Sequence, residues 1–291
     1  MSFRAADRAQ SIQIGAVLLL GALVLSFSLY QAVVVPDQNR EVEFNHNQRV
    51  QGDLQDLRNA IVSTEGGGSG QSVSVTLGTQ YPSRVVALNP GTPSGSLRSL
   101  WTANMSQNAT VGNAEAVGET GDFWTGVNRS YNTGGLVYRP GYNEYTQAPV
   151  TRFEQSVLYN QFPGSTLTLT GQRLISDDRI SLVTLNGSYD TTRSGSASVD
   201  VRPISASANT VTVTNATPGE NVTLRFATQL TADQWRDILA SEFVSPDGSG
   251  GNVVAVDPTE VPGEEYRIVS VVLRRGVDHD LRITQAGVGT G

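Results

Sequence analysis

One uninterrupted apolar run constrains this chain more than any other feature. Residues 14–35 read IGAVLLLGALVLSFSLYQAVVV, with Gln31 as the only strongly polar residue. As a helix, the run rises roughly 33 Å, enough to cross a hydrocarbon core of about 30 Å, whereas a helix of a globular protein keeps a polar face. Tyr30 lies where an interfacial aromatic residue is expected, and Pro36 is expected to end or kink the helix. The sequence therefore predicts one transmembrane helix over residues 10–36.

The arginines on either side of this run predict its orientation. Arg4 and Arg8 precede it, and the next arginine along the chain is Arg40. Because positive residues favour the cytoplasmic side, we expect the N-terminus in the cytoplasm and residues 37–291 outside the cell. The run is longer than the apolar part of a cleaved secretory signal, and residues 32–36 lack a small-residue cleavage site. A retained, single-pass anchor in the cell membrane is therefore predicted.

The flank before the apolar run carries a family resemblance. Residues 7–15, DRAQSIQIG, resemble the class III signal of archaeal type IV pilin-like proteins and archaellins. The resemblance implies cleavage between Ala9 and Gln10, which removes a cytoplasmic leader of residues 1–9 and leaves the apolar helix on the mature protein. The early glutamate common in bacterial pilins is absent, since Ile14 stands at the fifth mature position. An ordinary signal anchor with the same flank is the alternative.

A wider likeness covers much of the chain. Residues 30–61 and 135–149 are similar to a group of uncharacterised haloarchaeal membrane-anchored surface proteins, which brings no known activity with it. All 20 basic residues are Arg, and 27 residues are acidic. Since carboxylates and guanidinium groups tolerate salt better than lysine, we expect a salt-loving source. A GC-rich genome, which also favours Arg codons, is the alternative explanation.

A second helix is predicted directly after the membrane segment. Apolar residues recur at helical spacing, which predicts a stalk helix over residues 37–64. This helix either packs against like subunits or docks on its own outer domain. The Gly-rich residues 65–72 are interpreted as a flexible linker, because no Gly-Lys-Ser/Thr of a phosphate loop follows them. The apolar residues at helical spacing in the stalk helix are Val50, Leu54, Leu57 and Ile61.

From residue 73 to residue 291 the pattern is typical of an all-β domain. Thr and Val alternate with period two between turn residues, which favours short strands of a β-sandwich. A capping box at Thr231 and Gln234 begins one short helix, whose Trp235 is expected in the core. The fold class predicted is therefore mainly β, with an N-terminal transmembrane helix extended by a stalk helix and one further short helix. The predicted strands are 72–77, 166–170, 180–186, 196–201, 210–214, 221–226 and 266–273.

The composition excludes several kinds of chemistry. The absence of Cys rules out thiol nucleophiles, disulfides and Cys-ligated metals, and the absence of Lys rules out Schiff-base catalysis. A net charge of −7 disfavours a nucleic-acid partner. We therefore expect no cofactor, no metal site and no nucleic acid.

Few residues have the pattern of a catalytic site. His46 is expected on a solvated face of the stalk, and His279, between two aspartates, in a polar turn. One tripeptide cannot complete a metal site, and no Gly-x-Ser-x-Gly motif accompanies it. No catalytic residue is assigned. The remaining acidic candidates are interpreted as solvated loops: Asp177 with Asp178, Glu264 with Glu265, and Asp247.

Two further groups of residues concern the surface. Five aromatic residues fall within one Gly- and Pro-containing stretch, where they either pack a loop-rich part of the core or form a binding surface: Trp124, Tyr131, Tyr138, Tyr142 and Tyr145. Six Asn-x-Ser/Thr sequons lie on the predicted outer side and are candidate glycosylation sites: Asn104, Asn108, Asn128, Asn186, Asn215 and Asn221.

These observations predict a pilin-like cell-surface protein with a structural or adhesive, non-catalytic role. Its expected partners are the lipid bilayer, like subunits through the N-terminal helix, and surface glycans or proteins. A monomeric, membrane-anchored binding module is the alternative, and an extracellular hydrolase is a third possibility.

Overall fold

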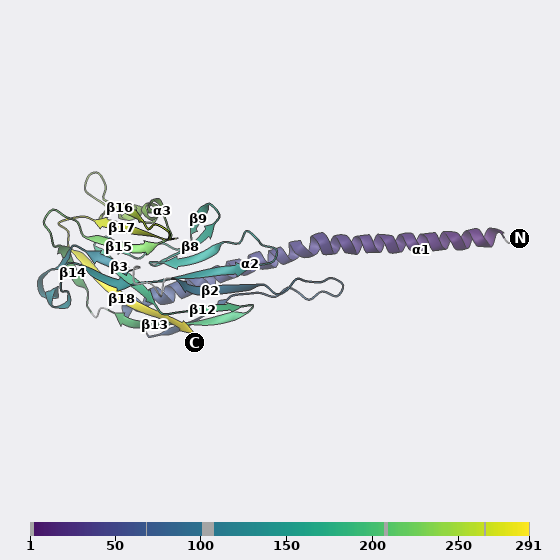
Figure 1. Ribbon diagram of the computed structural model, residues 1–291, viewed down its shortest axis with the longest axis horizontal. Coiled ribbons are helices and arrows are strands. Elements are labelled where there is room, and N and C mark those ends of the chain that lie inside the picture. Colours follow the sequence, from purple (N-terminus) through teal and green to yellow (C-terminus); the bar gives the residue numbers. More distant parts are fainter. Residues whose placement is uncertain (1–2, 68, 101–107, 207–208, 265, 291) are drawn as a thin grey trace.

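The computed structural model describes residues 3–290 apart from 68, 101–107, 207–208 and 265. A β-rich head lies at one end, and a long helix projects from it for about half of the length of the molecule (Figure 1). The C-terminus lies on the head, far from the N-terminal tip of the helix. The molecule thus consists of a folded head and a helical rod whose N-terminal part projects from it.

The rod is one continuous helical segment. It comprises α1 (Phe3–Leu29), a π-helical turn (Tyr30–Val34) and α2 (Val35–Ser63). The 54 residues Gln13–Gly66 include an 18-residue window with a mean hydropathy of 2.2, of which nothing is buried against the head. By length and composition, the helix is therefore able to span a membrane.

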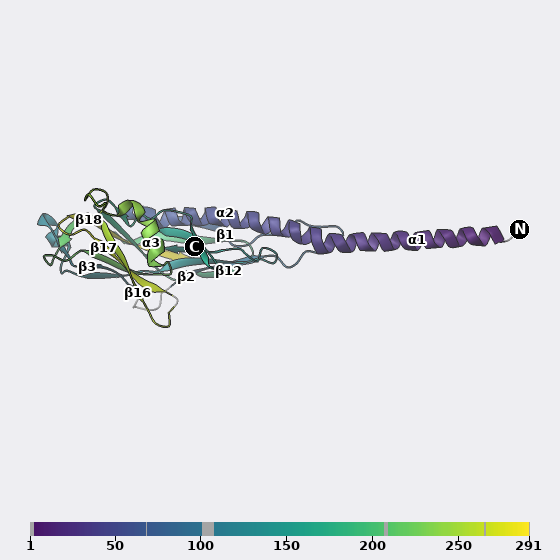
Figure 2. The same cartoon turned by 90° about the horizontal axis from the view of Figure 1, so that it is seen from above.

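The helix does not end at Pro36. The π-helical turn comes directly before this residue, and Pro36 lies in the first turn of α2, which continues to Ser63. Proline has no backbone N–H to donate to the preceding turn, and a π-helical turn accommodates such a missing hydrogen bond. The two predicted helices are therefore joined in one rod, seen also from above (Figure 2).

The described part of the head contains three β-sheets, which we call sheets A, B and C. Neighbouring strands are antiparallel except for β11 and β18, which are parallel. Sheet A consists of β1 (Gln71–Thr76), β13 (Ser196–Ala206), β18 (His279–Thr290), β11 (Arg179–Asn186), β10 (Ile175–Ser176), β14 (Val211–Asn215) and β4 (Ala114–Ala116). Sheet B consists of β12 (Asp190–Arg193), β2 (Ser94–Leu100), β6 (Gly135–Gly141), β7 (Val150–Glu154), β8 (Val157–Phe162) and β9 (Ser165–Thr168). Sheet C consists of β16 (Val253–Glu260), β17 (Arg267–Leu273), β15 (Thr223–Thr228), β3 (Asn108–Gly112) and β5 (Arg129–Asn132).

Short helical segments complete the head. They are the 3-10 helices Thr64–Gly66, Gly118–Phe123 and Ala240–Glu242, and the α-helix α3 (Ala232–Ile238). The predicted capping box is present, because Thr231 Oγ1 accepts from the N–H of Gln234 and Gln234 Oε1 accepts from the N–H of Thr231. Trp235 is fully buried, as predicted.

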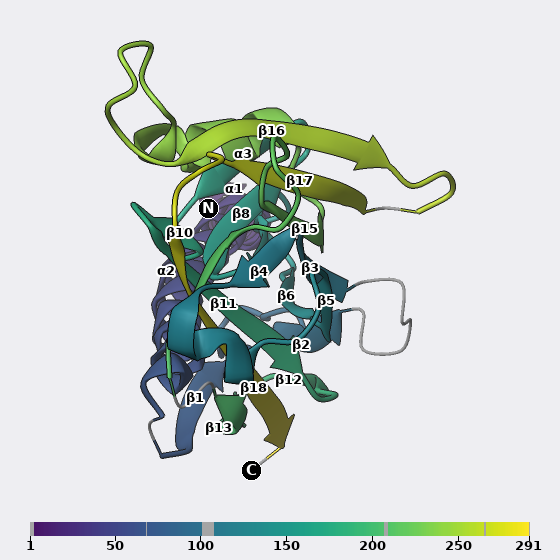
Figure 3. The same cartoon turned by 90° about the vertical axis from the view of Figure 1, so that its left-hand side faces the viewer.

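Two hydrophobic clusters fill the described part of the head. One lies between sheets A and C, is extended by Val157 and Tyr159 of β8 in sheet B, and includes Trp235 of α3. The other lies between sheets A and B and includes the apolar face of α2. Strand β11 contributes to both, because alternate residues of a strand point to opposite faces: Leu182 belongs to the first cluster and Val183 to the second. Viewed along the rod, β16 and β17 lie at one end of the stack and β1 and β13 at the other, with α2 along one side (Figure 3).

The architecture confirms the mainly β fold class with a long N-terminal helix and one later α-helix. Each of the seven predicted strands overlaps a strand of the structure. Of the Gly-rich residues interpreted as a flexible linker, those that the structure describes instead make a tight connection. Thr64–Gly66 form a 3-10 turn, Gly67 adopts a left-handed φ of 70° suited to glycine, and β1 begins at Gln71.

Candidate functional site

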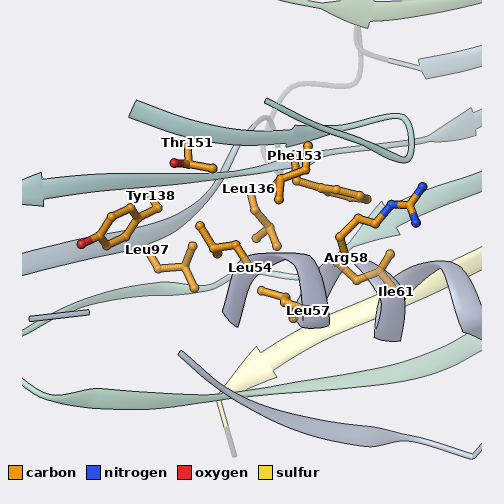
Figure 4. Close-up of a pocket in the computed structure, with 10 residues that line it drawn as sticks. Leu54, Leu57, Arg58, Ile61, Leu97, Leu136, Tyr138, Thr151 and Phe153 are labelled. Atoms are coloured by element: carbon orange, nitrogen blue, oxygen red, sulfur yellow. The ribbon is translucent and has the colours of Figure 1, made fainter. Parts of the chain in front are cut away.

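The most informative site is the face of α2 that enters the head. Leu54, Leu57 and Ile61 line a narrow space between the helix and the strands of sheet B (Figure 4). The space left between the helix and the sheet is about 10 Å³, which is too small for anything larger than a water molecule. The opposing strands contribute Leu97, Leu136, Tyr138, Thr151, Phe153 and Leu158. This part of α2 is therefore a core element of the head and does not stand free as a stalk.

A buried arginine adds specific hydrogen bonds to this contact. Arg58 Nε donates to the carbonyl oxygen of Ser156 at 2.9 Å, and its Nη2 donates to that of Gly171, also at 2.9 Å. Both acceptors lie on loops that follow strands of sheet B or precede them. Arg58 thereby fixes the rotation of the helix as well as its depth, which apolar packing alone specifies less strictly.

The same face continues towards the membrane segment with polar residues. Asn39, Glu43 and His46 precede Val50 at spacings of four, three and four, and each of these three polar residues has an exposed fraction of 0%. The expectation that His46 lies on a solvated face is therefore wrong. Its helical position places it in line with Val50, and loops of the head cover it.

Glu43 is held by the loop after β6. Its Oε1 accepts from the N–H of Asn143 at 2.8 Å, and its Oε2 accepts from the N–H groups of Glu144 at 2.8 Å and Tyr145 at 2.5 Å. The hydroxyl of Tyr81 also donates to Oε1. These four donors replace the water molecules that a carboxylate binds in solution, which makes the burial of Glu43 possible.

His46 makes a contact with the same loop. Its Nδ1 lies 2.6 Å from the hydroxyl of Tyr142, and the two rings meet edge to face with centroids 5.7 Å apart. Burial and the nearby charge of Arg49 lower the pKa of His46. Burial raises the pKa of Tyr142 to about 12. At neutral pH the contact therefore joins a neutral imidazole and a protonated hydroxyl.

The loop of residues 77–93, between β1 and β2, runs along the helix towards the membrane segment (Figures 1 and 2). The side-chain amide of Gln31 donates to the carbonyl oxygen of Leu88 and accepts from its N–H, both at 2.9 Å. The guanidinium of Arg84 donates to Asn39 Oδ1 at 3.0 Å and to the hydroxyl of Tyr30 at 3.3 Å. The loop is thus attached to the helix at the level of the apolar run.

The five aromatic residues do not form one surface. Trp124 and Tyr138 are buried, with the indole N–H of Trp124 donating to Ala114 and the hydroxyl of Tyr138 donating to Leu77. Tyr131 packs against the cluster between sheets A and C. Tyr142 and Tyr145 lie against α2 and stack on each other at 6.0 Å. Packing rather than a shared binding surface explains this stretch.

The charged candidates do not assemble either. The expectation that His279 lies in a polar turn is wrong: it begins β18 and is buried, with Nε2 3.3 Å from the carbonyl oxygen of Arg274. Asp177 and Asp178 lie in the turn between β10 and β11. Among the described residues, no three His, Asp or Glu side chains are grouped so that they could hold a metal. Of the other candidates, Glu264 and Asp247 are exposed, and Glu265 lies outside the described residues.

Glu154 is a buried carboxylate to which no sequence pattern points. Its Oε1 accepts from the hydroxyl of Tyr159 at 2.9 Å, and its Oε2 accepts from Thr228 Oγ1 at 2.8 Å and the N–H of Gln229 at 2.9 Å. Burial raises the pKa of Glu154. These bonds join β7 of sheet B to the end of β15 in sheet C, so the residue links two sheets.

A polar groove of about 630 Å³ opens beside the turn that carries Asp177 and Asp178. Its lining also includes Arg173, Arg179 and Glu242. The volume matches that of a small-ligand site, but the lining is charged rather than apolar. The groove offers hydrogen-bonding and ionic contacts to a polar ligand.

The sequons differ in how available their side-chain amides are. Asn128 and Asn186 are exposed, and both lend their side-chain oxygen to a backbone N–H. Asn215 and Asn221 donate their amide nitrogens to the carbonyl oxygens of Thr217 and Leu273. Since glycan attachment needs that nitrogen, Asn128 and Asn186 have the more accessible geometry. Asn108 begins β3 and is half-buried, whereas Asn104 lies outside the described residues.

Comparison with known proteins gives one distant relative. An uncharacterised protein of Archaeoglobus fulgidus is 25% identical over 251 residues, which cover 86% of this chain and 40% of the relative. The chain thus spans less than half the length of that relative. No protein-family model matches the sequence. No solved structure matches it either.

Proposed function

We propose that this protein is a pilin-like cell-surface protein with a structural or adhesive, non-catalytic role, anchored by its N-terminal helix. In this proposal α1 crosses the cell membrane with its N-terminus in the cytoplasm, and the head lies outside. Cleavage between Ala9 and Gln10, whose backbone is part of α1, leaves the apolar helix on the mature protein. Like subunits meet through that helix, and glycans occupy some of the sequons.

One observation carries this proposal: a single helix serves two regions. Its first half is apolar and bare, with Leu18, Leu19 and Leu25 exposed by 65–67%. Its second half is part of the core of the head. An anchor on a flexible linker would leave the head free to tumble, whereas an unbroken helix holds the head at a fixed angle to the membrane or to neighbouring subunits. A fixed angle is what a structural subunit requires.

The mature N-terminus tests the proposal directly. The protein is isolated from native membranes, and its first peptide is identified by mass spectrometry. A start at Gln10 supports processing of the pilin type, and we expect an A9D variant to remain unprocessed while an R4Q variant is cut normally. A start at Met1 or Ser2 in the unaltered protein would contradict the pilin-like proposal and leave an ordinary signal anchor.

A second candidate function is a monomeric, membrane-anchored binding module. The polar groove beside Asp177 and Asp178 favours it, because its size fits a sugar unit or a short polar segment of a protein. Binding to cell-surface glycans is measured with the full-length protein in detergent and with a D178N variant. A ligand that binds both proteins equally would place its site elsewhere. The third possibility, an extracellular hydrolase, is supported by no grouping of the candidate residues in the described part of the chain.

A further inference from the structure

We propose that residues 84–89, which we call the membrane finger, insert their apolar tip into the outer leaflet of the bilayer beside the transmembrane helix. The inference rests on the proposed membrane anchoring of α1. It assigns the finger a partner, the boundary between lipid headgroups and acyl chains, and makes it a second attachment of the head to the membrane.

The tip of the finger is unusually apolar for a loop. Val85 is fully exposed, Val86 is exposed by 66% and Leu88 by 81%. Single exposed apolar residues are common on soluble proteins, but here three of four consecutive residues project from the end of one long loop. Nothing in the described part of the head covers them.

The contact with Gln31 fixes the height of this tip. Both hydrogen-bonding groups of the Gln31 amide are used by the backbone of Leu88, so the tip is level with a residue inside the apolar run. At about 1.5 Å per residue, Gln31 lies roughly 7 Å below Pro36 along the helix axis. Lipid that surrounds the helix at Gln31 therefore also meets Val85, Val86 and Leu88.

The same contact explains the one strongly polar residue of the run. A side-chain amide without partners is costly in a membrane, and polar residues within membrane helices normally find a partner. Leu88 supplies both a donor and an acceptor to Gln31. The finger thus provides hydrogen-bond partners for the Gln31 side chain, and Gln31 provides partners for the N–H and the carbonyl oxygen of Leu88.

Above the tip, the finger becomes polar at the level where the headgroups begin. The guanidinium of Arg84 donates to Gln38 and Asn39, which follow Gln31 by seven and eight residues towards the head, and also to the hydroxyl of Tyr30. Arginine and tyrosine are typical of the membrane interface, where a charged or polar end stays wet while apolar parts face lipid. The order along the helix axis, apolar tip below and arginine above, matches the polarity gradient of one leaflet.

Site-directed fluorescence tests the finger, because the chain has no native Cys. Single-cysteine variants of the full-length protein carry the polarity-sensitive dye NBD and are reconstituted into phosphatidylcholine vesicles, some with nitroxide on the upper acyl chain. V86C reports on the tip. L19C, in the bare helix, reports on membrane insertion, and L167C, an exposed residue of β9, reports on the head.

We expect blue-shifted emission and at least twofold quenching by nitroxide lipid for V86C and L19C, with neither effect for L167C. If L19C is quenched while V86C emits as L167C does, the finger does not enter lipid and the proposal fails although the anchor holds. If L19C is not quenched, the anchoring itself fails. Emission from V86C that is blue-shifted without lipid quenching, and that disappears on dilution of protein in lipid, would assign the tip to a second copy of this chain and also overturn the proposal.

Discussion

The two halves of the buried face of α2 are equally inaccessible to water and are held by different forces. Glu43 and Ile61 each have an exposed fraction of 0%, yet Ile61 packs among apolar side chains of two sheets, whereas Glu43 accepts hydrogen bonds from a loop. Apolar packing stabilises the helix in the head but is non-directional, so it does not fix the rotation of the helix strictly. Hydrogen bonds fix the angle and contribute less net free energy.

This difference assigns the two halves separate tasks. The half from Val50 to Ile61 makes the helix part of the fold. The half from Asn39 to His46, next to the membrane segment, determines how the head is oriented on its anchor. A mutation in the first half is expected to change the free energy of unfolding most, and a mutation in the second half is expected to change local order around the junction.

The largest effect is expected from truncating an apolar side chain of the first half. L57A removes a fully buried side chain from tight packing and leaves a cavity, which costs about 2–5 kcal/mol of unfolding free energy. Urea unfolding of the full-length protein in detergent, followed by tryptophan fluorescence, measures the change. L167A is the matched control, since Leu167 is 56% exposed and its loss is expected to cost less than about 0.5 kcal/mol. Equal losses for both variants would show that α2 is not a core element.

A smaller effect is expected from the carboxylate of the second half. E43A leaves three backbone N–H groups and the hydroxyl of Tyr81 without their acceptor, at a cost of about 2 kcal/mol. Hydrogen exchange of the amides of residues 143–145 is expected to accelerate selectively. E43Q keeps one side-chain oxygen and is expected to fall between E43A and the unaltered protein. Unchanged protection of these amides in E43A would show that the carboxylate of Glu43 does not hold the loop after β6.

The sequence predicted the first half of this face and missed the second for a physical reason. Val50, Leu54, Leu57 and Ile61 are visible because apolar residues at helical spacing indicate a buried stripe whatever covers it. Asn39, Glu43 and His46 continue the same spacing, but a polar residue is buried only where specific partners exist. Those partners, such as Tyr81 and Asn143, lie 38 and 100 residues away from Glu43 in the chain.

The strands show a similar limit. Strands with alternating Thr and Val, such as β1 and β14, were predictable because one face is buried and the other is wet. β18 was missed, although it lies at the centre of sheet A between β13 and β11. Its residues 285–289 read QAGVG, without β-branched alternation, since small residues are accommodated where strands are packed on both faces.

The pH dependence of stability sharpens the comparison further. Burial lowers the pKa of both His46 and His279. As the pH falls below about 6.5, the unfolded chain takes up protons that the folded protein does not, so stability is lost on acidification, by at most about 1.4 kcal/mol per pH unit for each histidine. Unfolding free energies of the unaltered protein and H46Q are compared between pH 8 and pH 5. The raised pKa of Glu154 acts on both proteins and cancels in the difference.

The H46Q variant is expected to have the flatter profile, because glutamine does not titrate and still offers an oxygen to the hydroxyl of Tyr142. H279Q is the control, because His279 is buried elsewhere in the head. The pH dependence of the unfolding free energy that is due to His46 is expected to remain in H279Q. If H46Q is as steep as the unaltered protein, His46 titrates alike in the folded and unfolded chains, and the burial that lowers its pKa does not persist in solution.

The smallest effect is expected where the helix leaves the head altogether. Arg84 bonds to the side chains of Tyr30, the first residue of the π-helical turn, and of Asn39, beyond the turn in α2. These bonds are half-buried and go to neutral acceptors, so R84A is expected to lower the unfolding free energy by about 1 kcal/mol. Exchange of the Leu88 amide, which donates to Gln31, is expected to accelerate clearly, because Arg84 also donates to Asn89, the residue after Leu88. R84K keeps the charge but not the planar fork and is expected to behave as R84A does. If R84K protected the Leu88 amide fully, a positive charge at residue 84 would be enough to hold the loop on the helix. The directed hydrogen bonds of the guanidinium would then not be needed, whereas the attachment of α2 through Glu43 depends on directed hydrogen bonds.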